Sequence, residues 1–298
     1  MKTDFYLRRL PVLAGAVLIA LVASGCTTTA TTSHQVSGMR SVSQDGAPGA
    51  MSELRIAESA LESGNMDMAT TIYEKILRAN PRSVEAMTGL GNTLYSVGDF
   101  TRAGVYYSKA AAIDGNAPAP LIGMARVAIH QRRFDDAIAT YRHVLAESPD
   151  DPLAAAGLGA AYDMKGDHAT AQAVLRDALK RNPGDTSLSV NLGTSLIMAG
   201  KPRDGANVLL DVTRFPAAPP QARQDLALAY GLLGNDDAAA EILSRDLPKA
   251  SVQDNLRFYE LQRQRIGASG TSGASATSGS NASVAPVAAP AVAAVSLR

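Results

Sequence analysis

The sequence has no tryptophan, one cysteine and only five phenylalanines among its 298 residues. The single cysteine, Cys26, cannot form an intrachain disulfide, so the fold must depend on packing alone. Neither sign of charge is in excess, because 28 basic residues balance 28 acidic ones. No basic tract is dense enough to bind along a phosphate backbone, so we do not expect the chain to bind nucleic acid. Residues 50–265 also lack the alternating apolar pattern of β-strands.

Groups of residues that carry chemistry are scarce as well. No HExxH motif, cysteine pair or glycine-rich phosphate loop is present, and the four histidines are scattered: His34, His130, His143 and His168. The paired acids at 135–136 and 236–237 open predicted helices, where carboxylates favourably meet the positive end of the helix dipole. We therefore predict no catalytic residue, metal, cofactor or small-molecule substrate, and expect that the chain is not an enzyme.

What the sequence does contain is a period of 34 residues. Glycine recurs with this spacing, and an arginine fills the one gap: Gly64, Gly98, Arg132, Gly166, Gly200 and Gly234. Five residues after each of these comes a small residue: Ala69, Ala103, Ala137, Ala171, Gly205 and Ala239. A period of 34 with this pattern is typical of the tetratricopeptide repeat, a helix–turn–helix unit that stacks into a solenoid.

Positions within the repeat are counted from residues 50, 84, 118, 152, 186 and 220. Position 7 is apolar and positions 8 and 20 are small in every copy, while position 24 carries a large apolar side chain. Small residues at 8 and 20 allow the two helices of a repeat to approach closely. We predict an all-α solenoid of about six helix pairs over residues 50–266, closed by a capping helix at Ser251–Ile266 with a polar outer face.

The N-terminus has the layout of a secretory signal. Basic residues precede an apolar stretch, Leu10–Val22, which is too short to span a bilayer, and small residues then precede Cys26. This order resembles a bacterial lipobox and implies a signal peptide at 1–25 and lipidation of Cys26, although an ordinary cleavage site with a stray thiol is the alternative. Thr27 in place of aspartate favours the outer membrane of a Gram-negative bacterium, with the solenoid facing the periplasm.

Two low-complexity segments flank the predicted solenoid. Residues 26–49 are rich in Thr, Ser, Gly and Ala, and we predict that they form a flexible lipidated tether. Residues 267–298 consist mainly of Ala, Ser, Gly, Val and Pro, and we predict that they form a disordered tail.

The predicted binding surface is the inner face of the solenoid. In proteins of this repeat family, positions 2, 5, 9, 12 and 13 of the first helix face inward. The groove residues predicted on this basis are Tyr95, Ile122, Arg126, Ile129, Met164, Ile197, Met198, Leu228 and Leu232. Clustered Lys, Arg and Asn that would grip a C-terminal carboxylate are absent. We therefore predict that this apolar groove takes a peptide or amphipathic helix of a partner protein.

Two stretches carry a closer resemblance. They are 54–81, with its LRIAESA opening, and 225–259, which includes DLALAYGLLGN, RDL and NLRFY. Together with the lipobox they resemble the TadD family, the tetratricopeptide-repeat lipoproteins of the tight-adherence (Flp) pilus system. The resemblance implies a pilotin that holds the secretin, or another pilus-assembly protein, at the outer membrane. A scaffold for peptidoglycan hydrolases or synthases is the alternative, and a periplasmic peptidase or hydrolase is a more remote one.

Overall fold

The computed structural model describes residues 48–272, and every regular element within that range is a helix. The prediction of an all-α fold is therefore confirmed. The helices are α1 (Pro48–Glu62), α2 (Met66–Ala79), α3 (Val84–Ser96), α4 (Phe100–Ile113), α5 (Pro118–His130), α6 (Phe134–Glu147), α7 (Pro152–Lys165), α8 (His168–Arg181), α9 (Thr186–Met198), α10 (Pro202–Thr213), α11 (Pro220–Leu232), α12 (Asp236–Leu243) and α13 (Lys249–Ser272). The predicted signal peptide, Cys26 and most of the tether lie outside the described residues.

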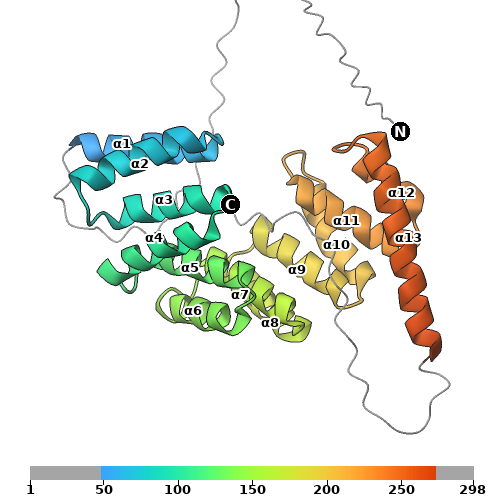
Figure 1. Cartoon of the computed structure of the whole chain (residues 1–298). Coiled ribbons are helices and arrows are strands. Elements are labelled where there is room, and N and C mark those ends of the chain that lie inside the picture. The colour runs from blue at the N-terminus through green and yellow to red at the C-terminus, as the bar shows by residue number, and fades with distance from the viewer. Residues whose placement is uncertain (1–47, 273–298) are drawn as a thin grey trace, which may run out of the picture. The chain divides into compact units, whose positions relative to one another are not determined.

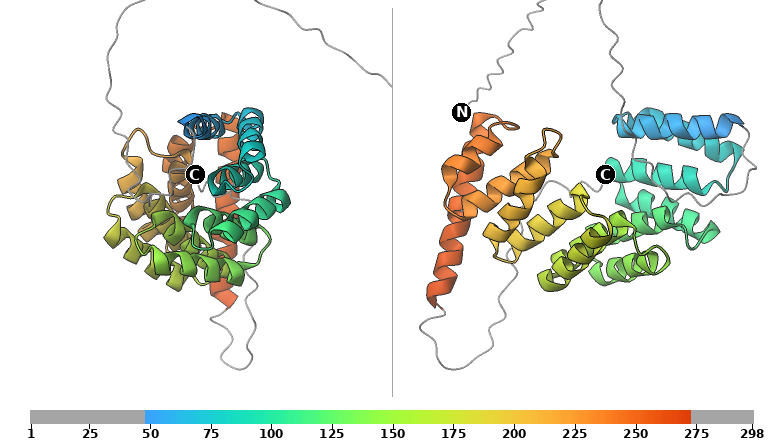
Figure 2. Two further views of the ribbon diagram at one scale, coloured as in Figure 1. Left: turned by 90° about the vertical axis from the view of Figure 1, so that its left-hand side faces the viewer. Right: turned by 180° about the vertical axis from the view of Figure 1, so that it is seen from behind.

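The helices form two layers (Figure 1). Each helix contacts the next one along the chain, and each first helix also contacts the first helix of the following repeat, from α1 to α13. Within residues 48–272, consecutive second helices such as α4 and α6 make no such contact. The first helices are therefore spaced more closely than the second helices and form the inner layer. Figure 2 shows the stack turned by 90° and from behind.

Short polar side chains start most of the helices. Asn65, Asp99, Asp167 and Asn235 each accept a hydrogen bond from a backbone N–H in the first turn of a second helix. Each stands directly after the turn residue of its repeat, so the 34-residue period places a cap at the start of α2, α4, α8 and α12. Arg133 and Lys201 occupy the same position before α6 and α10 and make no side-chain cap hydrogen bond. The paired acids at 135–136 and 236–237 lie in first turns, as expected from the helix dipole.

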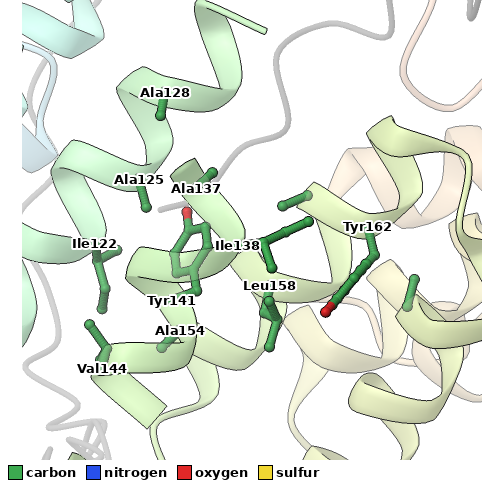
Figure 3. Packing of buried hydrophobic residues seen from close by; sticks show 12 residues of the cluster. Ile122, Ala125, Ala128, Ala137, Ile138, Tyr141, Val144, Ala154, Leu158 and Tyr162 are labelled. Carbon is green, nitrogen blue, oxygen red and sulfur yellow. The ribbon is translucent and has the colours of Figure 1, made fainter. Parts of the chain in front are cut away.

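Large side chains at position 24 hold the layers together. Each is at most 2% exposed: Tyr73, Tyr107, Tyr141, Leu175, Leu209 and Leu243. A Cβ atom added to Gly91 in α3 would lie 2.6 Å from the Tyr107 ring, and one added to Gly123 in α5 would lie 2.4 Å from it. The tyrosine is therefore wedged between two consecutive first helices, and only glycine leaves it room. Figure 3 shows the corresponding packing around Tyr141.

Position 6 of each repeat matches the size of the preceding wedge. After a tyrosine wedge, position 6 is glycine, as at Gly123 and Gly157. After the shorter wedges Leu175 and Leu209, position 6 is instead Asn191 or Asp225. A leucine fills less space than a tyrosine, so the inner helix can carry a polar side chain at that position.

The turn within each repeat contains a residue in the left-handed backbone conformation. The five turn glycines, such as Gly98 and Gly166, have φ between 74° and 88°, which glycine adopts without steric clash. Arg132, which replaces glycine in the third repeat, has a φ of 60°. This non-glycine residue keeps the turn but pays the steric cost of its Cβ atom.

The C-terminal end differs from the other repeats. Helix α12 has only 8 residues, and α13 packs on α11 and α12, as predicted for a capping helix. Tyr259 of α13 fills the space above Gly231, and Arg263 binds both carboxylate oxygens of Asp236 at 2.7 and 2.9 Å. The bounds of this helix require a correction, because α13 runs from Lys249 through Ser272. The segment predicted as a tail from residue 267 therefore begins with helix.

Candidate protein-binding surface on the inner layer

The inner layer exposes fewer of its positions than the family pattern implies. Residues at positions 9 and 13 are exposed or half-buried in every repeat, and those at position 2 are too, as shown by Leu153. Residues at position 5 are buried in the second to fifth repeats and those at position 12 in the fourth to sixth, as shown by Val190 and Asp163, whereas position 12 is half-buried in the first three repeats. We call the residues at positions 2, 9 and 13 the inner face; they follow one side of each helix at intervals of seven and four residues.

The predicted groove residues separate into two groups. Met164 and Met198 are 46% and 40% exposed, and a further five are half-buried: Tyr95, Arg126, Ile129, Leu228 and Leu232. Ile122 and Ile197, in contrast, are each only 5% exposed and belong to the hydrophobic core. A Cβ atom added to Gly205 would lie 2.6 Å from the Ile197 side chain, so this isoleucine points into its own repeat. A partner can reach the first group but not these two isoleucines.

The inner face changes character along the stack. The first repeat contributes Glu58 and Glu62, and the third contributes Arg126. The fourth to sixth repeats contribute mainly apolar residues, including the exposed methionines. Partial desolvation and the nearby charge of Glu62 raise the pKa of Glu58. A ligand lying along this face therefore meets acidic, then basic, then apolar side chains.

A cluster of rings surrounds Arg126, and the sequence pattern did not predict it. The guanidinium carbon lies 4.1 Å from the centre of the Tyr95 ring. The Tyr95 hydroxyl is 2.6 Å from Nε2 of His130, and the His130 ring stacks on Phe100 with centroids 4.0 Å apart. Partial desolvation and the charge of Arg126 lower the pKa of His130, so Arg126 supplies the positive charge of the group at neutral pH. We call these four residues the Arg126 cluster.

Some buried polar atoms at the boundaries between repeats have a hydrogen-bond partner, and others have none among the described residues. The Tyr107 hydroxyl donates to Oδ1 of Asn92 at 2.7 Å, whereas the hydroxyl of Tyr141, one repeat later, is buried without a hydrogen-bond partner among the described residues. The same is true of Nε of Arg126 and Nδ2 of Asn191. All three unpartnered groups belong to the third to fifth repeats, in the middle of the stack.

Two buried carboxylates join the later repeats. Oδ1 of Asp163 accepts hydrogen bonds from His168 and from Ser195 in the next repeat, each at 2.8 Å. Oδ2 of Asp225 accepts one from Thr194 at 2.7 Å. Burial raises the pKa of Asp163 and raises that of Asp225 to about 6. Although Asp163, His168 and Ser195 lie together, the serine bonds to the carboxylate and not to the imidazole, so the three residues lack the serine–histidine–aspartate order of a catalytic triad.

In the outer layer, a groove of about 630 Å³ lies between α4 and α6. Gly104, Ser108 and Ala112 form its α4 wall, and Val127 of α5 lies at its floor. The groove exists because α4 is built from small residues where the corresponding positions of α6 hold Ile138 and an arginine.

No group of three or more histidine, cysteine, aspartate or glutamate side chains in the described part of the chain is arranged to hold a metal ion. No helix within residues 48–272 combines the length and the apolar character needed to cross a membrane.

Comparisons with known proteins agree with this architecture. A tetratricopeptide-repeat family described as the Cilia and flagella-associated protein 70 C-terminal domain matches residues 41–225, which is more than half of the chain. The chain belongs to this family of repeat proteins. A curated relative, the "Cellulose synthase 2 operon protein C" of Komagataeibacter xylinus, is 31% identical over 157 residues; the match covers 52% of this chain but only 12% of the relative. The chain thus spans a small part of that relative's length.

Solved structures share the fold at low sequence identity. The structure titled "Functional Characterization of Pseudomonas Aeruginosa pilF" matches with a TM-score of 0.55 and 17% identity, and the match covers 74% of this chain and 97% of that one. The structure of PilW, described as a "widely conserved type IV pilus biogenesis factor", matches with a TM-score of 0.58 and 17% identity, covering 74% of this chain and 99% of that one. At this identity the likeness is one of fold.

Proposed function

We propose that this chain is a lipid-anchored scaffold that binds a protein component of a pilus-assembly machine at the outer membrane. The observation that carries the proposal is the inner face, where Met164 and Met198 are exposed and Leu228 and Leu232 are half-buried. Exposed methionines on a concave apolar surface suit a protein ligand, because their flexible side chains adapt to its shape. The fold shared with a type IV pilus biogenesis factor supports the same class of function.

The more specific form of the proposal is a pilotin for the secretin of the tight-adherence (Flp) pilus. It rests on the sequence resemblance and on the predicted lipidation of Cys26, which lies outside the described residues. A lipid anchor and a tethered binding surface together raise the local concentration of a captured subunit at the membrane. The anchor would thus hold the binding face beside the membrane, where the partner assembles.

The binding half of the proposal is tested by charge substitutions on the inner face. Met164→Glu and Met198→Glu should abolish capture of the secretin by the purified chain, because each places a charge on the apolar contact surface. Leu210→Glu is the matched control, since Leu210 is 43% exposed on the outer helix α10. Capture that survives both methionine substitutions would refute binding at this face.

The cellular half is tested by deletion. Loss of the chain should remove secretin multimers from outer-membrane fractions, and Cys26→Ser should have the same effect while leaving the solenoid folded. Secretin multimers that persist in normal amounts after deletion would rule out the pilotin assignment. Purified peptidoglycan hydrolases or synthases retained by the chain, with no retention of secretin, would favour the alternative scaffold role.

A further inference from the structure

Arg126 is a charged side chain on the inner face without a charged partner. Among the described residues, no carboxylate lies within ion-pair distance of Arg126 and no hydrogen bond uses its side chain. A guanidinium has five N–H donors, and its Nε is buried here, so water cannot reach that donor. Arg126 as a whole is only half-buried, and no acceptor among the described residues binds its terminal N–H groups, so an acceptor supplied by a ligand can reach them.

The surroundings hold Arg126 in a fixed place. Its guanidinium lies over the Tyr95 ring, and Tyr95 is itself held by the hydroxyl contact to His130, which is stacked on Phe100. These contacts join α3, α4 and α5, so the position of the charge is set by two repeats and not by one flexible side chain. A preorganised planar guanidinium is well suited to a carboxylate, which it can bind through two parallel hydrogen bonds.

The charges on either side give the ligand an orientation. Toward the first repeat the face presents Glu58 and Glu62, which repel an anionic segment and suit a cationic or polar one. Toward the fourth repeat the face continues with Met164 and then Met198. The apolar part of a ligand that places an anion on Arg126 must therefore extend toward the later repeats.

We propose that the inner face binds a partner segment in which a single carboxylate lies beside apolar residues, with the carboxylate on Arg126 and the apolar side chains on the methionine-bearing repeats. This inference rests on the proposed function, whose binding face it specifies. Adjacent packed helices lie roughly 8–10 Å apart, and a ligand in the polyproline II conformation advances about 3.1 Å per residue and turns every third side chain to the same side. The apolar residues of the ligand should therefore recur about every third residue from the carboxylate.

Designed peptides and the full chain test this spacing and charge. Two fluorescein-labelled probes of ten residues differ only in chain direction. In one, aspartate is the first residue and leucines follow three, six and nine residues later; the other has the same residues in reverse order. Serine fills the remaining positions of both probes. Each has an analogue with asparagine in place of the aspartate. By fluorescence anisotropy, one direction should bind about tenfold more tightly with aspartate than with asparagine, because a charge-assisted pair is stronger than a neutral hydrogen bond.

Variants of the chain then locate the contact. Arg126→Gln should reduce the tenfold preference to near unity, whereas Arg126→Lys should retain part of it. Arg142→Gln is the matched control, because Arg142 also lies over a tyrosine ring, that of Tyr162, but belongs to the outer helix α6. It should keep the full preference.

Three results would overturn the inference: equal binding of the aspartate and asparagine probes, binding of neither, or a preference that persists in Arg126→Gln. The proposed function has a separate readout. If Arg126→Gln still captures the secretin as well as the unmodified chain does, the scaffold role stands and the carboxylate contact fails. If the unmodified chain captures no secretin but shows the tenfold preference, the carboxylate contact stands and the scaffold role fails.

Discussion

Two wedge tyrosines offer a matched test of the packing described above. Tyr107 and Tyr141 occupy the same position of consecutive repeats, and both are 0% exposed. Their hydroxyls differ, because that of Tyr107 donates to Asn92 at 2.7 Å and that of Tyr141 has no partner among the described residues. Replacing each by phenylalanine removes only the hydroxyl and leaves the ring in its glycine-lined space.

The two substitutions should change stability in opposite directions. Tyr107→Phe breaks a hydrogen bond and should lower the free energy of unfolding by about 1 kcal/mol. Tyr141→Phe removes a buried hydroxyl whose desolvation costs about 1–3 kcal/mol when unpaired, so it should raise that free energy by about 1 kcal/mol. The difference of about 2 kcal/mol exceeds the error of a urea titration followed by far-UV circular dichroism.

The measurement compares the urea midpoints of the two variants with that of the unmodified chain under one set of conditions. Equal slopes of the transitions would show that the substitutions leave the surface exposed on unfolding unchanged. If Tyr141→Phe destabilises the chain as much as Tyr107→Phe does, the Tyr141 hydroxyl is satisfied in solution.

Three further predictions concern stability. Gly157→Ala should destabilise the chain by about 1–3 kcal/mol in a thermal melt, because the new Cβ would lie 2.3 Å from the buried Tyr141 ring. Gly104→Ala should stabilise the chain by up to about 1 kcal/mol in the same melt, because its new Cβ makes only an ordinary contact at 3.5 Å. Arg132→Gly should stabilise the chain by about 0.5–1 kcal/mol in the same melt, because glycine adopts the positive φ of 60° without strain. Burial raises the pKa of Asp225 to about 6, so the folded state holds its proton more tightly than the unfolded state; the stability from this group should be greatest below about pH 4 and fall by about 2–3 kcal/mol as the pH rises to 6. Asp225→Asn should flatten that dependence in urea titrations at several pH values.

Each of these predictions has an outcome that contradicts it. Equal melting temperatures for the two glycine variants would mean that the ring moves aside easily. A less stable Arg132→Gly would mean that the contact of the arginine with the Phe134 ring, at 5.8 Å, outweighs the backbone strain. An unchanged pH profile in Asp225→Asn would assign the dependence to Asp163, whose pKa burial also raises.

Most of the fold could be predicted from the spacing of small and apolar residues. The turn glycines, the wedge at position 24 and the small residues at positions 8 and 20 recur at fixed intervals, and each interval has one structural cause. The end of α13 could not be predicted, because Ala, Ser and Gly after Ile266 gave no apolar pattern to follow. The helix nevertheless continues through Ser272.

The candidate surface was harder to predict than the fold. The family pattern assigns inward-facing positions by helix geometry alone, but burial at positions 5 and 12 depends on how closely neighbouring helices approach. Ile197 is buried because its repeat has Gly205 where the other repeats have alanine. That substitution was visible in the sequence and could have signalled the burial. The Arg126 cluster gave no such signal, because it depends on the side-chain conformations of two adjacent repeats.

Contacts between helices in residues 48–272 reach only nearest neighbours within and between repeats. Such a chain has no single long-range contact whose loss would release the whole molecule at once. Tension applied between the two ends of the described residues should therefore unfold the helix pairs one after another, each lengthening the chain at a similar force. A solenoid of this kind would lengthen gradually under a sudden force, and its helix pairs would refold when the force is removed.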